Sequence, residues 1–449
     1  MVVYQKIAFA THTAHFTNYF TSTLFLVDVK IIFMKKFLAI LVLSLLFISN
    51  SYATHFLTKK ARAVCTVNQD IDLIMNWKLD DGSWEVEKFG LKKGDHLKMH
   101  KHKKKNTKWY VGSDGAIFPL KNTDWDRVEV SKKYEGIKIK DIIGSCKKIK
   151  YIKYKSHTAN SFNEIFNKKY SSKSVKLSGE LYLPDKKGKF PVLYVQHGTA
   201  HPNRHTDFFQ KLIVEMHKKN IGVFIGDSYT NRGIKQKDGW KLGLAARVLD
   251  GLNVLNTLSK HKNIDENKIG ITGYSYGGMV AFYTAYPKLL DLVSNGKQFA
   301  AYMPVYPGCD LVFKDMKLVN KPMLMLHAEF DDYAPTVDCI NYVKKLKENN
   351  NRVELKIYKG AYHGFVSVRE KEKEFLPDIG NFINCEPGYI TDEGYWFYNN
   401  KEWKNMTELE AVNLIWKQCG QLGVTIGGTF EQQQQAILDT VNFFNKYLK

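Results

Sequence analysis

Cysteine and long apolar runs are both scarce in this sequence. The 449 residues contain six cysteines, and no C-x-x-C pair occurs among them, which argues against a zinc site built from thiolates. The apolar run nearest the N-terminus spans residues 37–48, whereas a bilayer requires roughly 20 residues. No cysteine comes directly after that run, so a lipoprotein anchor is not expected. No segment repeats at a fixed period, so a propeller is not expected either.

The residues around the apolar run are typical of a signal peptide. A short basic start begins at Met34 and small residues end at Ala53, so we expect a signal peptide over 34–53, although an uncleaved anchor is an alternative. Signal peptides begin at the initiator, so we expect translation to start at Met34 and residues 1–33 to be a mis-assigned start. We therefore expect an exported protein, periplasmic or secreted, with no stable membrane span after cleavage. In such a compartment six cysteines can form three disulfides in any of 15 pairings.

Acidic residues are few relative to basic ones. Asp and Glu number 45 against 66 Lys and Arg, and the formal net charge is +21. The densest basic run, residues 100–105, has no interleaved aromatic residues, so we expect a solvated loop and no nucleic-acid partner. Contact with an anionic envelope or polymer through this N-terminal region is the alternative. His96, His100 and His102 lie near the run without a supporting carboxylate arrangement, so no metal is expected.

The composition and the pattern of apolar residues differ between the two parts of the chain. Residues 54–150 are polar and basic, with short β-leaning stretches between turns, and predict a small β-rich accessory domain. Over residues 151–449, apolar β-branched runs alternate with segments of helical period. This alternation predicts an α/β domain with a mostly parallel sheet and helices on both faces, interrupted by an insertion at about 384–428. The expected strands are 174–183, which alternates like an edge strand, and 190–196, 221–224, 268–272, 300–306, 323–326 and 353–358. The expected helices are 207–218, 240–258, 279–286, 336–347, 407–417 and 431–448.

The motif that carries chemistry is a G-x-S-x-G pattern formed by Gly273, Ser275 and Gly277. It follows an expected strand and precedes an expected helix, which is the context of a nucleophile elbow. At such a turn the serine backbone is strained, and a Cβ at either glycine would crowd the strand or the helix. We expect Ser275 to be the nucleophile.

A serine nucleophile needs a histidine base and an acid that orients the histidine. Asp331 follows the expected strand 323–326, and His363 follows the expected strand 353–358, so the order is Ser, acid, His. Taken alone, a loop His or Asp is more often a solvated residue or a turn former. Asp332 is an alternative acid, and we prefer Asp331.

Acyl transfer also requires two donors for the developing oxyanion. The backbone N–H of Tyr276, after the nucleophile, and that of Thr199, after His197 and Gly198, fit this role. Neither a metal nor an organic cofactor is needed for this chemistry.

At these residues the chain resembles the dienelactone hydrolase family of the α/β-hydrolases, in particular its exported members that carry serine. The resemblance covers residues 173–449 and rests on these segments: His197–Gly198, Asp227–Ser228 with Arg232–Gly233, Gly273–Gly278, Tyr306–Cys309, Asp331–Asp332 and His363–Phe365. It implies the α/β-hydrolase fold, the triad of Ser275, His363 and Asp331, and a small ester as substrate. The family's namesakes use cysteine as nucleophile, so their lactone chemistry is not carried over.

The same resemblance implies three disulfides: Cys309–Cys339 beside the acid loop, Cys385–Cys419 in the insertion, and Cys65–Cys146 in the N-terminal domain. It also places Arg232 where a substrate carboxylate could meet it, although a structural ion pair is an equal alternative.

Three functions are compatible with this sequence. The first is hydrolysis of a carboxylic ester, thioester or lactone through an acyl-enzyme. The second follows from a likeness of the serine motif to prolyl-oligopeptidase-type peptidases, although too few residues precede the hydrolase part for the propeller that usually gates those enzymes. The third is a non-catalytic protein that binds the envelope through the same fold.

Overall fold

The computed structural model describes residues 60–78, 84–101, 108–111, 117–119, 128–130, 142–200, 202–367 and 373–449. The expected start at Met34, the signal peptide and His102 lie outside these ranges. Within them, no helix combines the length and the hydropathy needed to cross a membrane.

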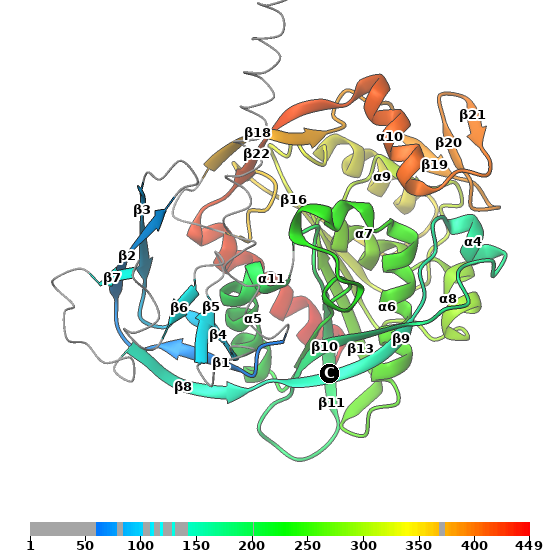
Figure 1. Ribbon diagram of the computed structural model, residues 1–449. Coiled ribbons are helices and arrows are strands. Elements are labelled where there is room, and N and C mark those ends of the chain that lie inside the picture. Colours follow the sequence, from blue (N-terminus) through cyan, green and yellow to red (C-terminus); the bar gives the residue numbers. More distant parts are fainter. Residues whose placement is uncertain are drawn as a thin grey trace, which may run out of the picture. The chain divides into compact units, whose positions relative to one another are not determined.

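A central eight-stranded sheet forms the larger part of the structure (Figure 1). Its order is β9-β10-β12-β11-β13-β14-β16-β17, and β10 alone runs opposite to the other strands. The strands are β9 (Lys150–Ser156), β10 (Val175–Tyr182), β11 (Phe190–Gln196), β12 (Gly222–Ile225), β13 (Ile264–Tyr274), β14 (Tyr302–Val305), β16 (Met323–Ala328) and β17 (Val353–Tyr358). Strands β11, β12 and β14 are buried almost throughout, which explains their continuous apolar sequences.

Helices cover both faces of this sheet, as predicted for an α/β domain (Figure 1). One apolar core contains the buried residues of α5 (Thr206–Lys218) and α11 (Phe430–Tyr447). The other contains those of α6 (Leu244–Leu258), α8 (Pro287–Ser294) and α9 (Thr336–Glu348). The strand order and this two-sided covering are those of the α/β-hydrolase fold.

The prediction that residues 174–183 form an edge strand was wrong. Strand β10 lies between β12 and β9, and five consecutive residues in it are buried. The edge is β9, whose lysines at 150, 153 and 155 hid it among the basic residues of the N-terminal part. Lysine is common on sheet edges because its charge discourages further pairing.

The N-terminal part is rich in β-structure, as predicted. One sheet has the order β6-β5-β4-β1-β8 and another the order β3-β2-β7. Their strands are β1 (Ala63–Val67), β2 (Ile71–Lys78), β3 (Trp84–Leu91), β4 (His96–Lys101), β5 (Lys108–Val111), β6 (Ile117–Pro119), β7 (Val128–Val130) and β8 (Ile143–Lys148). Because Ile149 alone separates β8 from β9, the chain passes directly from one sheet into the other. The domain boundary near residue 150 stays a prediction.

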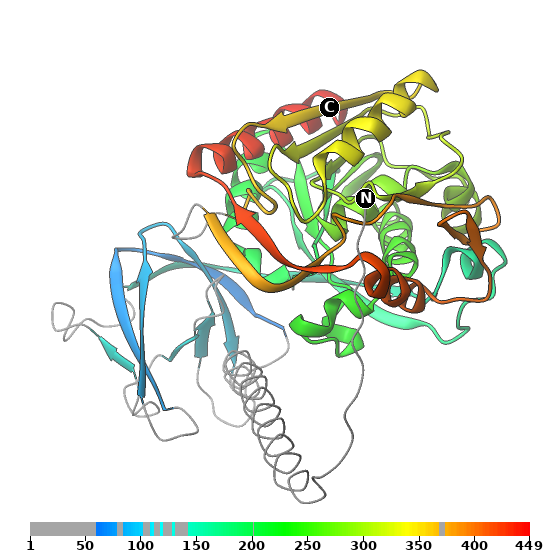
Figure 2. The same cartoon turned by 90° about the horizontal axis from the view of Figure 1, so that it is seen from above.

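The predicted insertion contains one strand of a two-stranded ribbon, part of a small sheet and a helix. Strand β18 (Lys373–Asn381) pairs with β22 (Gln421–Gly427), and Figure 2 shows the two side by side. The small sheet has the order β15-β19-β20-β21, with β15 (Leu311–Phe313), β19 (Gly388–Ile390), β20 (Trp396–Tyr398) and β21 (Lys401–Trp403). Helix α10 spans Glu408–Cys419, close to the expected 407–417. The first strand of the ribbon, β18, ends before residue 384, where the insertion is expected to begin. The bounds of the insertion stay a prediction.

Candidate active site

Ser275 lies at the sharp turn between β13 and α7 (Tyr276–Tyr283). Its φ of 54° and ψ of −121° fall where residues with a side chain are strained. A Cβ on Gly273 would overlap the carbonyl oxygen of Gly277, and a Cβ on Gly277 would overlap the carbonyl oxygen of Gln196. The two glycines therefore have the steric role that the motif predicted.

His363 contacts both partners that the sequence assigned to it. Its Nε2 lies 2.9 Å from Ser275 Oγ, and its Nδ1 lies 2.8 Å from Oδ2 and 3.0 Å from Oδ1 of Asp331. His363 is 6% exposed, and so is Asp331, so the pair is screened little by water. With Nδ1–H donating to the carboxylate, Nε2 of the neutral imidazole is free to accept the serine hydroxyl proton.

The acid loop holds its two carboxylates in different environments. Asp331 Oδ1 also accepts from the backbone N–H of Ala334 at 2.8 Å and of Tyr333 at 3.1 Å. Asp332 instead accepts from the N–H of Thr425 at 2.8 and 3.0 Å. The structure thus brings Asp331, and not Asp332, to the histidine.

Strand β22 of the insertion supports the histidine loop as well. The N–H of Tyr362 donates to the carbonyl of Gly427 at 3.0 Å, and the N–H of Gly427 donates to the carbonyl of His363 at 2.9 Å. With the bond from Thr425 to Asp332, one strand holds both the acid loop and the base loop. Sequence reasoning predicted the insertion but assigned it no such role.

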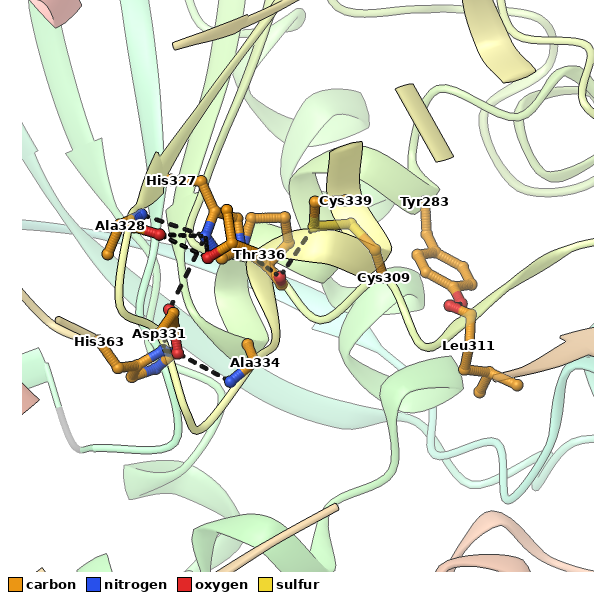
Figure 3. Close-up of a disulfide and its surroundings, with 11 residues drawn as sticks. Tyr283, Cys309, Leu311, His327, Ala328, Asp331, Ala334, Thr336, Cys339 and His363 are labelled. Atoms are coloured by element: carbon orange, nitrogen blue, oxygen red, sulfur yellow. Dashed lines mark hydrogen bonds and ion pairs between the residues drawn. A yellow bond between two sulfur atoms is a disulfide. The ribbon is translucent and has the colours of Figure 1, made fainter. Parts of the chain in front are cut away.

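A buried histidine lies next to Asp331, and a disulfide lies beyond this histidine (Figure 3). Cys309 is bonded to Cys339 of α9, and the two other predicted pairs, Cys65–Cys146 and Cys385–Cys419, are also present. All three predicted pairings are thereby confirmed.

The buried histidine is His327, which sequence reasoning did not single out. Burial lowers its pKa. Its Nδ1 accepts from the N–H of Ala328 at 3.1 Å, which leaves Nε2–H to donate to the carbonyl of Pro307 at 3.3 Å. With one ring nitrogen accepting and the other donating, His327 is neutral, and its Nδ1 lies 3.9 Å from Oδ2 of Asp331.

The two expected oxyanion donors belong to two segments that meet at Ser275. Tyr276 is the first residue of α7, so its N–H has no acceptor within the helix. Thr199 follows Gly198, where an added Cβ would lie 3.5 Å from Ser275 Cβ and 2.9 Å from the Tyr274 carbonyl oxygen. The turn after β11 therefore passes close to the serine.

Arg232 is hydrogen-bonded to other groups of the protein and is not open to a substrate. Its guanidinium donates to both carboxylate oxygens of Asp250, at 2.7 and 2.9 Å. It also donates to the carbonyls of Ser228 and His157, at 2.9 and 3.1 Å, and its side chain is 7% exposed. This geometry favours the structural ion pair of the two alternatives.

The histidines near the basic run do not converge on a metal site in the described part of the chain. His96 Nδ1 lies 3.2 Å from an oxygen of Asp207. Among the described residues, no three His, Cys, Asp or Glu side chains are grouped so that they could hold a metal ion.

A buried carboxyl, Glu408, connects the insertion with the start of α6. Its oxygens accept from the N–H of Ala245 at 3.2 and 3.1 Å, and the side chain fills the space beside Gly243. Burial raises the pKa of Glu408 to about 8. Sequence reasoning missed this residue, because an acidic residue in a first helical turn looks like an exposed one.

The strand order, the two-sided helix covering and the strand–serine–helix turn together define an α/β-hydrolase. Residues 213–381, which include Ser275, Asp331 and His363, match the model of the dienelactone hydrolase family. The resemblance inferred from the motifs is therefore confirmed for this part of the chain.

Known proteins related to this chain cover only part of it. Protein usf of Aquifex pyrophilus is 27% identical over 107 residues, which is 23% of this chain and 42% of that protein. Similar solved structures include the esterase Est2 of Thermogutta terrifontis with bound propionate, at 19% identity and a TM-score of 0.35, covering 43% of this chain and 81% of that one. An esterase of Pyrobaculum calidifontis has 18% identity and a TM-score of 0.36, covering 43% of this chain and 74% of that one. The sequence relative is thus matched over less than half of its own length.

Proposed function

We propose that this protein hydrolyses carboxylic esters through an acyl-enzyme formed on Ser275. The observation that carries the proposal is the continuous contact from Ser275 Oγ to His363 Nε2, at 2.9 Å, and from His363 Nδ1 to Asp331, at 2.8 Å. This is the arrangement that makes a serine hydroxyl nucleophilic at neutral pH. The match of residues 213–381 to the dienelactone hydrolase family supports the ester as substrate class.

The reaction proceeds in two displacements. Ser275 Oγ bonds to the acyl carbon while its proton passes to His363 Nε2, and the carbonyl oxygen becomes an oxyanion. The N–H groups of Thr199 and Tyr276 stabilise this oxyanion. The bond to the leaving oxygen then breaks as that oxygen takes the proton from His363. Water then attacks the acyl carbon while His363 Nε2 takes its proton. The bond from the acyl carbon to Ser275 Oγ breaks as Oγ takes that proton back, which releases the acid and free Ser275.

We also propose that the protein acts outside the cytoplasm. All six cysteines are paired in three disulfides, and structural disulfides persist in oxidising compartments. Contact of the basic N-terminal part with an anionic envelope remains part of this proposal.

Substrate class is tested by comparing p-nitrophenyl acetate with a proline-linked p-nitroanilide, using wild-type protein and Ser275→Ala. We expect hydrolysis of the ester by the wild type only, and no turnover of the anilide. Turnover of the anilide would favour a peptidase. Absence of both activities in folded wild-type protein would favour a non-catalytic binding role.

A further inference from the structure

The most deeply buried cation of the described hydrolase part lies beside the proposed oxyanion hole. Arg247, in the first turn of α6, is 0% exposed and is the largest fully buried side chain. Among the described residues no carboxylate lies within ion-pair distance of it, in contrast to Arg232, which is paired with Asp250. Burying an unpaired charge is costly, so its retention calls for a reason in the groups that it contacts.

The guanidinium of Arg247 contacts the turn that carries Thr199. One terminal nitrogen donates to the carbonyl of His197 and, at 3.1 Å, to the carbonyl of Gly198. The His197 ring accepts from the N–H of Ser228 at its Nε2, at 3.2 Å, so its Nδ1–H is a donor. That N–H is shared between the same Gly198 carbonyl, at 2.8 Å, and the Ala200 carbonyl, at 3.1 Å. The Gly198 carbonyl thus receives two hydrogen bonds, one of them from a charged donor.

The carbonyl of Gly198 and the N–H of Thr199 belong to one planar peptide group. Fixing the carbonyl therefore fixes the direction in which the Thr199 N–H points, away from Arg247. A charged donor on the carbonyl also polarises the peptide, which strengthens the N–H as a donor at the other end.

The same guanidinium contacts the residue that carries the second donor. Its central carbon lies 4.8 Å from the ring centroid of Tyr276, a cation–π distance, and 5.4 Å from that of Tyr229. Its other terminal nitrogen donates to Tyr229 Oη at 3.3 Å, and that hydroxyl donates to the Gly239 carbonyl at 3.0 Å. One side chain thus connects both sides of the proposed oxyanion hole.

We propose that Arg247 is a positioning residue for the oxyanion hole, which orients and polarises the Gly198–Thr199 peptide and holds it in register with Tyr276. This inference rests on the proposed ester hydrolysis. Its positive charge, unpaired by any described carboxylate, also stabilises negative charge that develops at the nearby acyl oxygen.

The test uses Arg247→Met, which keeps a long side chain without charge, and Arg247→Lys, which keeps the charge but lacks the planar guanidinium with its several N–H donors. Removing an oxyanion donor outright costs about 10²–10³ in kcat. Because Arg247 acts through the donors, we expect Arg247→Met to lower kcat for p-nitrophenyl acetate by about 10- to 100-fold with KM changed little, and Arg247→Lys to recover part of the loss. Tyr229→Phe removes only the hydroxyl that accepts from the other terminal nitrogen of Arg247 and keeps the ring beside His197, so we expect a smaller fall in kcat than in Arg247→Met.

A second readout separates positioning from general support of the fold. In a thionoester the atom that becomes negative is sulfur, which accepts hydrogen bonds weakly, so its hydrolysis depends less on the oxyanion hole. We expect Arg247→Met to lower the ratio of kcat/KM for the oxoester to kcat/KM for the thionoester. If the methionine variant fails to fold, the same ratio is measured in Arg247→Lys, where we expect a smaller fall. An unchanged ratio in a folded variant would overturn the role of Arg247 while leaving ester hydrolysis intact. Loss of the proposed function itself would appear differently, as a folded wild type with no activity above Ser275→Ala.

Discussion

The Nδ1 atom of His363 lies 2.8 Å from Oδ2 of Asp331, while the adjoining carboxylate, Asp332, accepts from the backbone of β22. Two neighbouring aspartates thus have separate tasks, and substituting each by asparagine distinguishes them. An amide at 331 donates to Nδ1 and forces the proton onto Nε2, so we expect Asp331→Asn to lower kcat by about 10³–10⁴-fold.

Asp332→Asn is the matched control for that prediction. Its amide oxygen can still accept from the Thr425 N–H, so we expect kcat within about threefold of wild type, measured on p-nitrophenyl acetate. The reverse order of the two effects would reassign the acid.

The close approach of backbone at the nucleophile turn gives a prediction about stability. Gly273→Ala introduces a Cβ that overlaps the Gly277 carbonyl, so we expect a loss of more than about 3 kcal/mol in the free energy of unfolding and no measurable activity. Urea unfolding followed by circular dichroism measures this. Gly188→Ala is the control: φ there is 130° but the space is open, so we expect a loss of about 1–2 kcal/mol with activity retained.

The disulfide between Cys309 and Cys339, near the acid loop, gives a third prediction. Cys309 and Cys339 are 30 residues apart, so replacing both by alanine is expected to lower the free energy of unfolding by about 3–4 kcal/mol. Since α9 follows the Asp331 loop directly, kcat is expected to fall as well. The double variant at Cys65 and Cys146 removes a disulfide far along the chain from the triad, and there we expect kcat to be retained at a temperature where the protein is folded. Equal kcat in both double variants would contradict a role for Cys309–Cys339 in holding the acid.

The raised pKa of Glu408 predicts a pH dependence of stability. The carboxyl has a pKa of about 8 in the folded chain against 4.5 ordinarily, so between these values the unfolded chain releases a proton that the folded chain retains. Stability contributed by this group is therefore lost as the pH rises from about 4.5 to 8. We expect Glu408→Gln to differ little from wild type in melting temperature at pH 4.5 and to be the more stable at pH 9, by an amount on the order of a few kcal/mol. A difference that stays constant across this range would contradict the buried, neutral state of Glu408.

Much of this fold was predictable because its signals are local. Strands β11 and β17 were predicted with the bounds that the structure has, and helical period predicted α5 and α11 to within about two residues. The three residues of the triad could be predicted for the same reason, because each of them follows a recognisable strand.

What the sequence did not reveal depends on contacts between distant segments. Strand β9 was not predicted, because the lysines exposed at this sheet edge interrupt its apolar pattern. Glu408, Arg247 and His327 are buried polar residues whose partners are backbone groups far away in sequence, and neither period nor motif marks such residues. The support of His363 by β22 likewise arises only when residues 363 and 426 meet in the fold.

The central claim is that Ser275 is the nucleophile, and a fluorophosphonate probe tests it most directly. Folded wild-type protein, treated with the probe, digested and analysed by mass spectrometry, is expected to carry one adduct per chain on the peptide that contains Ser275, and Ser275→Ala is expected to carry none. An adduct on another residue, or no adduct on folded wild-type protein, would contradict the account.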